Sequence, residues 1–286
     1  MDISYLERRF AFDNISSPFQ PLGTWWRPQF HSSPVQSNSS ITFRRRRPRM
    51  NTYRKTATIV GVLYIIGTVA GALGMVVGGS FLNAPDLLKM VAANASQVGL
   101  VALLMLVMGL PLAMVPAMMF PILKRQNEAL AIGYVIFRGA LESLTYVATA
   151  MCWLLLVVVA RQYADSGAEV ASQFSSLGIL LLKARDPILA VQDIVFSLGA
   201  LMFYYLLYQA RLIPQWLSGW GIVAAIPFLA VGLIYVFPGT TLVILLMPLA
   251  LQEMVMAVWL IVKGFNLSAI ASLSAKTATN EFLRAS

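Results

Sequence analysis

Long uninterrupted apolar blocks constrain the fold of this chain more than any other feature of its sequence. Several of them reach or exceed the roughly 20 residues that an α-helix needs to cross the hydrocarbon core of a bilayer. Only 12% of the 286 residues are charged, against roughly 25% in an ordinary soluble domain. Such a composition does not suit a surface that faces water. We therefore predict an all-α fold, a polytopic transmembrane helical bundle.

The apolar blocks predict about six membrane spans. The third block is the longest and would reach roughly 45 Å as a helix, which implies a tilt or an extension beyond the membrane. Pro238 and Gly239 separate the last two blocks as a very short hairpin. Within the polar linker 161–186, the apolar piece 174–182 is typical of an interfacial or re-entrant helix. The predicted spans cover residues 56–79, 98–122, 130–160, 187–208, 217–237 and 241–262.

The first 49 residues are polar and end in a run of arginines. One interpretation is a disordered basic tail that lies on anionic lipid, where each cation adds about 1 kcal/mol. The other is a mis-called start, with the chain beginning at Met50, because the composition changes abruptly there. The predicted domains are an N-terminal extension over residues 1–49, a six-span domain over 50–266 and a short cytoplasmic C-terminal tail over 267–286.

The positions of Lys and Arg predict the orientation of the bundle. Cations gather before the first span, between the second and third, between the fourth and fifth, and after the last. The linker 80–97 carries only Lys89, and the cations of the linker 161–186 are balanced by acids. The positive-inside rule then places both termini in the cytoplasm, in the inner (plasma) membrane. These cations explain the net charge of +9 without a nucleic-acid partner. The partner that we expect is the lipid bilayer.

Scarce cysteine and histidine exclude several kinds of chemistry. Cys152 is the only cysteine and His31 the only histidine. These counts exclude an intrachain disulfide, a Cys- or His-based metal site and a histidine-dependent catalytic triad. The sequence also lacks a Walker loop, a Rossmann glycine pattern and a nucleophile elbow. We expect no cofactor and no metal, and an enzyme is disfavoured.

Glycines recur at helical spacing in the first span. Gly67 with Gly71, and Gly74 with Gly78, form two small-xxx-small pairs that let another helix approach closely. The helix that packs on them belongs either to this chain or to a second protomer. The pattern therefore leaves open a homo-oligomer or a membrane-protein partner.

Prolines recur every five residues in the second span. Each removes a backbone hydrogen-bond donor, so this helix is predicted to be kinked or broken. A broken helix can line a substrate cavity. The three residues are Pro111, Pro116 and Pro121.

Ionisable residues inside the spans are the strongest functional signal, because a charge in mid-bilayer costs at least roughly 2.5 kcal/mol. Arg138 and Glu142 are four residues apart in the third span, so they share one helix face and can pair. Asp193 lies near the outer end of the fourth span, and Glu253 lies close to the middle of the sixth.

Two interpretations of these four residues remain open. In the functional one, Glu142 and Glu253 bind a proton or a cation, Arg138 orients or neutralises one of them, and Asp193 lies on the outer access path. In the structural one, Arg138 and Glu142 neutralise each other while the other two acids cap or cross-link helices.

Several phrases of the sequence resemble a known family. They read LAIGYVIFR over residues 130–138 with Glu142, YQARLIPQWL over 208–217, LQE over 251–253 and WLIVKGF over 259–265. In this order they resemble the bacterial multi-pass membrane family of domain of unknown function 4386, over roughly residues 53–266. The resemblance implies a prokaryotic integral membrane protein and no established activity, substrate or site. Gln215 departs from the pattern, since Arg is expected before the tryptophan.

Three functions follow from these observations. The first is an integral membrane protein of unknown activity with a proton- or ion-linked, transporter-like polar core. The second is a non-catalytic membrane assembly or partner-binding subunit that uses the glycine face. The third is an intramembrane lipid-acting enzyme, in which carboxylates alone would serve as acid and base.

Overall fold

The computed structural model describes residues 50–82, 85–236 and 243–285, all of which belong to one compact unit. Residues 1–49, predicted to be a basic tail or a mis-called extension before Met50, and the hairpin at Pro238 and Gly239 lie outside the described residues. Helices account for nearly all of what is described, and no strand occurs there. The elements are α1 (Met50–Leu82), α2 (Leu87–Ala93), α3 (Ala95–Leu123), α4 (Glu128–Tyr134), η2 (Val135–Leu141), α5 (Glu142–Asp165), α6 (Ala168–Lys183), α7 (Arg185–Ala210), α8 (Gln215–Tyr235), η3 (Val243–Leu246), α9 (Met247–Val262) and α10 (Leu267–Ala285).

Six of the described helical segments are long and apolar enough to cross a membrane, which confirms the predicted all-α bundle of about six spans. Many large apolar side chains on them are exposed, such as Met75 and Val76, each 77% accessible. A surface of this kind suits lipid rather than water, because lipid tails solvate apolar side chains. The six segments are Thr52–Phe81, Ala95–Leu123, Glu128–Asp165, Glu169–Ala210, Gln215–Tyr235 and Ile244–Val262.

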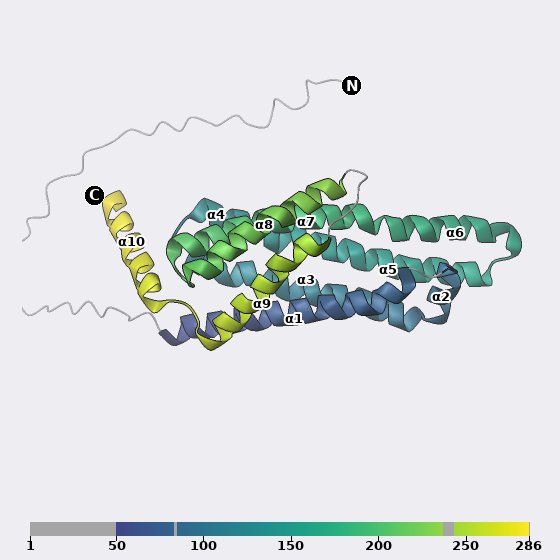
Figure 1. The fold of residues 1–286 in the computed structure, drawn as a ribbon, viewed down its shortest axis with the longest axis horizontal. Helices are drawn as coiled ribbons and strands as arrows, with labels where there is room; N and C mark the ends of the chain where they lie inside the picture. The colour runs from purple at the N-terminus through teal and green to yellow at the C-terminus, as the bar shows by residue number, and fades with distance from the viewer. Residues whose placement is uncertain (1–49, 83–84, 237–242, 286) are drawn as a thin grey trace, which may run out of the picture. The chain divides into compact units, whose positions relative to one another are not determined.

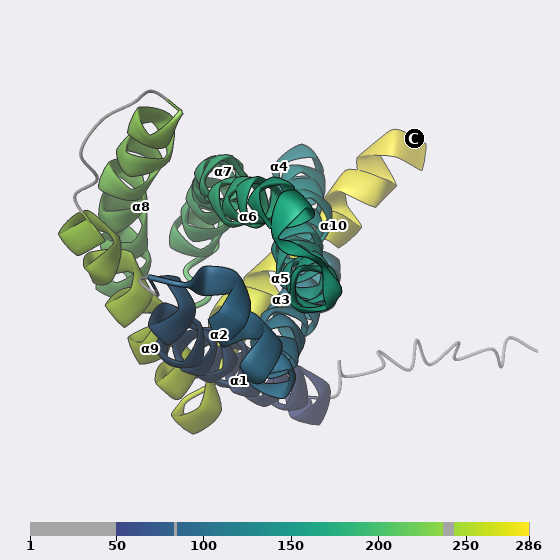
Figure 2. The same ribbon diagram turned by 90° about the vertical axis from the view of Figure 1, so that its right-hand side faces the viewer.

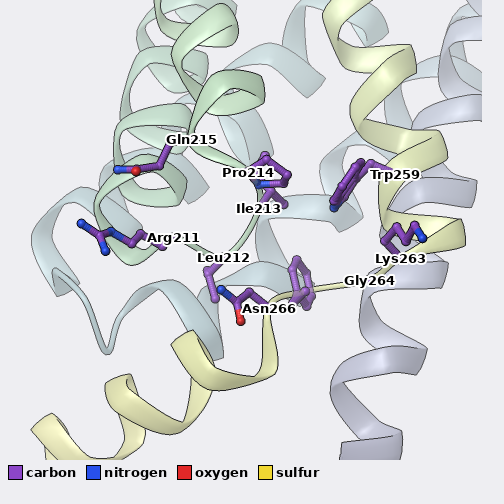
Figure 3. A pocket seen from close by; sticks show the side chains of 10 residues that line it. Arg211, Leu212, Ile213, Pro214, Gln215, Trp259, Lys263, Gly264 and Asn266 are labelled. Carbon is purple, nitrogen blue, oxygen red and sulfur yellow. The ribbon is translucent and has the colours of Figure 1, made fainter.

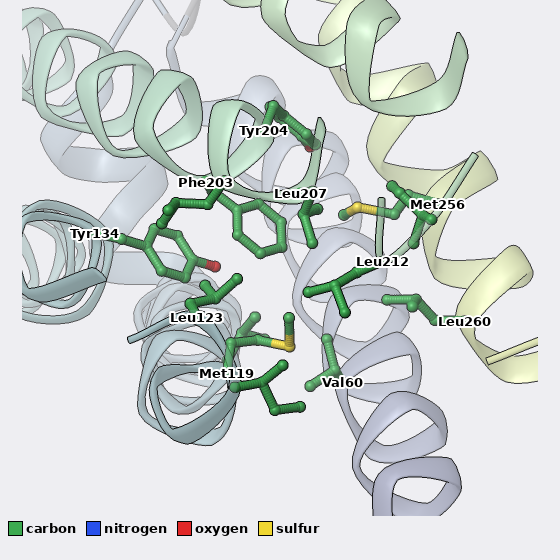
Figure 4. Close-up of a cluster of buried hydrophobic side chains, with 14 of the residues drawn as sticks. Val60, Met119, Leu123, Tyr134, Phe203, Tyr204, Leu207, Leu212, Met256 and Leu260 are labelled. Atoms are coloured by element: carbon green, nitrogen blue, oxygen red, sulfur yellow. The ribbon is translucent and has the colours of Figure 1, made fainter. Parts of the chain in front are cut away.

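The spans form a closed ring of neighbours. Helix α1 packs on α3, α3 on α5, α5 on α7, α7 on α8 and α8 on α9, and α9 returns to α1. The arrangement can be followed along the bundle in Figure 1 and end-on in Figure 2. Inside one half of the ring lies an apolar cluster contributed by α1, α3, α4, α5, α7, α8, α9 and α10, part of which is drawn in Figure 4. A second cluster around Phe81 and Trp153 fills the half that includes α2 and α6.

The structure adds detail to three parts of the sequence prediction. The linker 161–186 is mostly helix, because α5 continues to Asp165 and Ala184 keeps a right-handed helical backbone between α6 and α7. Leu88 of α2 packs against Gly178 of α6, so α6 takes part in the packing of the bundle. Helix α3 is unbroken from Ala95 to Leu123 despite its three prolines. The predicted C-terminal tail forms α10, whose Ala269, Ile270 and Leu273 join the first apolar cluster.

The glycines of α1 lie against side chains of the same chain. A β-carbon on Gly67 would lie 2.7 Å from Leu112 Cγ, and Gly71 and Gly74 lie equally close to Met108 and Met105 of α3. Gly78 lies beside Trp153 of α5 and Val101 of α3. The small residues therefore bring α1 close to α3 within one chain.

Candidate functional site

Arg138 lies in the middle of η2, a single π-helical turn between α4 and α5. Turns of this kind are frequent at functional sites because they shift the side-chain register of a helix. The Arg138 side chain is buried, and it occupies the space that Gly199 of α7 leaves free. Its guanidinium lies over the Phe196 ring, 4.2 Å from the ring centroid. Two elements, η2 and α7, thus hold the cation inside the bundle.

Two carboxylates bind this guanidinium. Arg138 Nη1 donates to both oxygens of Glu142 at 2.9 Å. Arg138 Nη2 donates to Glu253 Oε1 of α9, also at 2.9 Å. We call Arg138, Glu142 and Glu253 the ionic triad. It joins η2, α5 and α9, although Arg138 and Glu253 are 115 positions apart in the sequence.

The two carboxylates of the triad have different surroundings. Glu142 is 1% exposed and accepts a third hydrogen bond, from Tyr146 Oη at 2.8 Å. Glu253 is 11% exposed and accepts one bond, from Arg138. Within the described residues no hydrogen bond to Glu253 Oε2 occurs. Glu253 is therefore the more accessible and less satisfied acid of the pair.

The charges of the triad do not balance. One guanidinium faces two carboxylates, so the group carries a net negative charge when both acids are ionised. An uncompensated charge within a bilayer costs at least roughly 2.5 kcal/mol. A proton or a small cation on one carboxylate removes this cost. The arrangement is thus chemically suited to bind one positive charge.

Two buried polar atoms make no hydrogen bond among the described residues, the hydroxyl oxygen of Tyr204 and Oε1 of Gln252. The hydroxyls of Tyr64 and Tyr134 interact with each other, and that of Tyr64 also interacts with Arg138. The Tyr64 ring centroid lies 6.0 Å from the guanidinium carbon of Arg138. An unsatisfied buried polar group costs about 1–3 kcal/mol. These atoms therefore offer hydrogen-bond capacity next to the triad.

Asp193 does not join the triad. It lies on α7, is 8% exposed, and forms no ion pair among the described residues. Gly232 of α8 packs against it, since a β-carbon there would lie 2.9 Å from Asp193 Cβ. Ser197 donates its hydroxyl to the backbone oxygen of Asp193 at 2.6 Å. The structure thus brings together three of the four predicted polar residues and leaves the fourth apart.

Sequence reasoning missed the tyrosines around the triad. Tyr146 follows Glu142 by four residues, so helical spacing alone was a usable signal for this partner. Tyr64, Tyr134 and Tyr204 come from three different spans, and their shared location follows only from the packing. Among the described residues, no group of three His, Cys, Asp or Glu side chains is placed to hold a metal ion.

A comparison with protein-family models gives one match. The model described as Domain of unknown function (DUF4386) matches residues 59–264, which is more than half of the chain. All three triad residues fall inside the matched range. No curated protein and no solved structure matches the chain.

Proposed function

The chain belongs to the family of Domain of unknown function (DUF4386), as its sequence phrases indicated, and this family description assigns no activity. From the residues of the chain itself we propose that the protein is a proton-linked membrane protein with a transporter-like polar core, in which Glu253 binds and releases one proton. The observation that carries this proposal is the charge imbalance of the ionic triad, where one guanidinium faces two buried carboxylates.

Glu253 is the proton-binding group for two reasons. It makes one hydrogen bond where Glu142 makes three, so protonation breaks fewer interactions. It is also the most exposed member of the triad. A proton on Glu253 leaves Arg138 and Glu142 as a neutral pair. Its release restores the attraction between Glu253 and Arg138.

Protonation acts on the position of α9. The Glu253 carboxylate is the ionic link between α9 and the π-helical turn. When the proton neutralises this carboxylate, the link weakens and α9 is freer to move against its neighbours. A two-state element biased by a charge is the usual basis of a transport cycle.

The orientation of the proposed protein follows from its basic end. The linkers that join α3 to α4, α7 to α8 and α9 to α10 all carry cations, and α1 begins at the same end. Arg54 near the start of α1 donates to the backbone oxygens of Ile261 and Val262 at the end of α9. The positive-inside rule supports a cytoplasmic location for this end, and hence for both termini, in an inner (plasma) membrane.

Infrared difference spectroscopy of the reconstituted full chain tests the proposal. A pH step should produce the band of a protonated carboxyl group, and a pH-sensitive dye inside the vesicles should report proton uptake. Glu253→Gln should abolish both signals. The matched control is Glu128→Gln, which removes an exposed acid at the start of α4 and should leave both unchanged.

Folding must be measured in parallel, because a lost signal from an unfolded variant has no meaning. If Glu253→Gln melts like the parent and lacks the carboxyl band, the proton site is established. A band that persists in folded Glu253→Gln, or is missing from the parent, rejects the proposal.

The other two predicted functions gain no comparable support. The assembly role depended on the glycine face of α1, and that face packs against α3 and α5 of the same chain. The lipid-acting enzyme depended on carboxylates that serve as acid and base, and both triad carboxylates are engaged by Arg138.

A further inference from the structure

A polar pocket of about 390 Å³ lies at the basic end of the bundle, between the α7–α8 and α9–α10 linkers. Arg211 and Gln215 line one side, and Trp259 and Lys263 line the other, with Asn266 between them (Figure 3). We call it the headgroup pocket. Both cations are exposed, and no acid is among the residues that line the pocket.

A second pocket of about 420 Å³ adjoins the first and shares Arg211 and Asn266 with it. It adds a third cation, Lys276 of α10, together with the hydroxyls of Ser268 and Ser272. In the part of the chain that the structure describes, the only ion pairs are at Lys89 and Arg138. The cations around the pockets are therefore available, and cations with amide and hydroxyl donors form the usual binding set for phosphate.

The end of α7 places Arg211 where the two pockets meet. Arg211 is the C-cap of this helix, and its φ of 52° lets the Leu212 N–H donate to the backbone oxygen of Leu207. Left-handed residues commonly end helices in this way. The cap leads the chain into the α7–α8 linker, and Arg211 lines both pockets.

A shallow apolar groove, open to lipid, continues from the headgroup pocket along the surface of α9. It is lined by residues of this helix, among them Met254, Val255, Val258 and Val262. Trp259 and Lys263 line both the groove and the headgroup pocket. Val258 and Val262 are more than half exposed on the lipid-facing surface. A tryptophan between a polar and an apolar compartment is typical of the membrane interface.

We propose that these pockets bind an anionic phospholipid, with its phosphate between Arg211 and Lys263 and one acyl chain in the groove along α9. The polar pockets supply the charge and the donors, and the groove supplies the apolar surface. Free phosphate or a soluble phosphate ester fills only the first part of this site. The combination therefore selects a lipid over a soluble anion, in line with other basic pockets between spans.

Native mass spectrometry of the full chain in detergent tests this proposal. The probes are phosphatidylglycerol, phosphatidylcholine with the same chains, and glycerol 1-phosphate. We expect phosphatidylglycerol to bind most tightly and glycerol 1-phosphate, which has no chains, to bind weakly. In the double variant Arg211→Gln/Lys263→Gln, phosphatidylglycerol should bind about fivefold more weakly for each cation removed.

Matched variants separate the site from general surface charge. Lys55→Gln/Lys89→Gln removes two exposed cations that do not line the pockets and should leave binding unchanged. Val258→Gln should weaken lipid binding through the groove, whereas Val223→Gln, at a valine of α8 that is also more than half exposed, should not. All of these side chains are exposed, so the variants should fold. Equal binding of both lipids, equal binding of lipid and glycerol 1-phosphate, or equal loss in both double variants would overturn the proposal.

Discussion

Arg138 holds the interior together at the scale of single residues, because its guanidinium pairs with two buried carboxylates at once. Arg138→Gln keeps hydrogen-bonding atoms but leaves both acids without a cation. Removing one partner of a buried ionic group costs about 3–5 kcal/mol. We therefore expect a large drop in the melting temperature of the detergent-solubilised protein. Arg161→Gln, at an exposed arginine of α5, is the control.

A double-mutant cycle sharpens this prediction. Adding Glu142→Gln to Arg138→Gln removes one of the two unmatched charges, so the double variant should melt above Arg138→Gln alone. Additive losses in the cycle would show that Arg138 and Glu142 do not interact in the folded protein.

Tyrosine hydroxyls near the triad differ in what they contribute. The Tyr146 hydroxyl donates to Glu142, so Tyr146→Phe should lower the free energy of unfolding by about 1.5–3 kcal/mol. The Tyr204 hydroxyl is buried and makes no hydrogen bond with the described residues, so Tyr204→Phe should be neutral or stabilising. Denaturation of both variants under identical conditions measures the contrast. Equal losses would mean that the Tyr204 hydroxyl has a partner of its own.

At the scale of elements, the close approach of α1 and α9 depends on Gly61. A β-carbon there would lie 2.6 Å from the backbone oxygen of Ala257, which cannot move without moving α9. Gly61→Ala should cost about 1–3 kcal/mol through this overpacking. Gly79→Ala in the same helix meets nothing within 4 Å and should be neutral or stabilising. Thermal unfolding compares them, and a harmless Gly61→Ala would show that α9 yields without cost.

Sequence patterns predicted the elements unevenly. Apolar length was enough for the spans, because a bilayer requires helices of a fixed minimum length. The π-helical turn at Arg138 was missed, since it arises from packing against Gly199 rather than from local propensity. The apolar piece 174–182 predicted a helix within the linker, and the structure extends it to both sides as α6, because its polar ends carry no apolar signal. Its stability comes from contacts with α2 and α5, which no local pattern records.

At the scale of the whole molecule, the basic end should face the cytoplasm. In a Cys152→Ser background, Lys89→Cys lies on the opposite end and should react with a membrane-impermeant maleimide in intact cells. Ser268→Cys on α10 should react only after the cells are permeabilised. Both positions are exposed, so access depends on the side of the membrane alone. The reverse labelling pattern would show that the protein has the opposite orientation in the membrane.

The sequence predicted only part of the candidate site. Arg138 and Glu142 share a helix face, so helical spacing alone suggested their pairing. The contact of Arg138 with Glu253 spans 115 positions and follows from the return of α9 to α1, which hydropathy does not encode. Asp193 is an acid inside a predicted span, as Glu253 is, but it lies apart from the triad. Polarity within a span thus identified candidates, and only tertiary packing separated them.

The closed ring of spans has a consequence for the order in which the protein is made. Arg138 and Glu142 leave the ribosome together, so the arginine enters the bilayer with its counter-charge one turn away. Glu253 follows much later on α9, a helix that contains no lysine or arginine. This acid meets its cation only when α9 closes the ring. Closure of the ring and formation of the proposed proton site are therefore the same event. A chain truncated before α9 would insert into the membrane but would lack both.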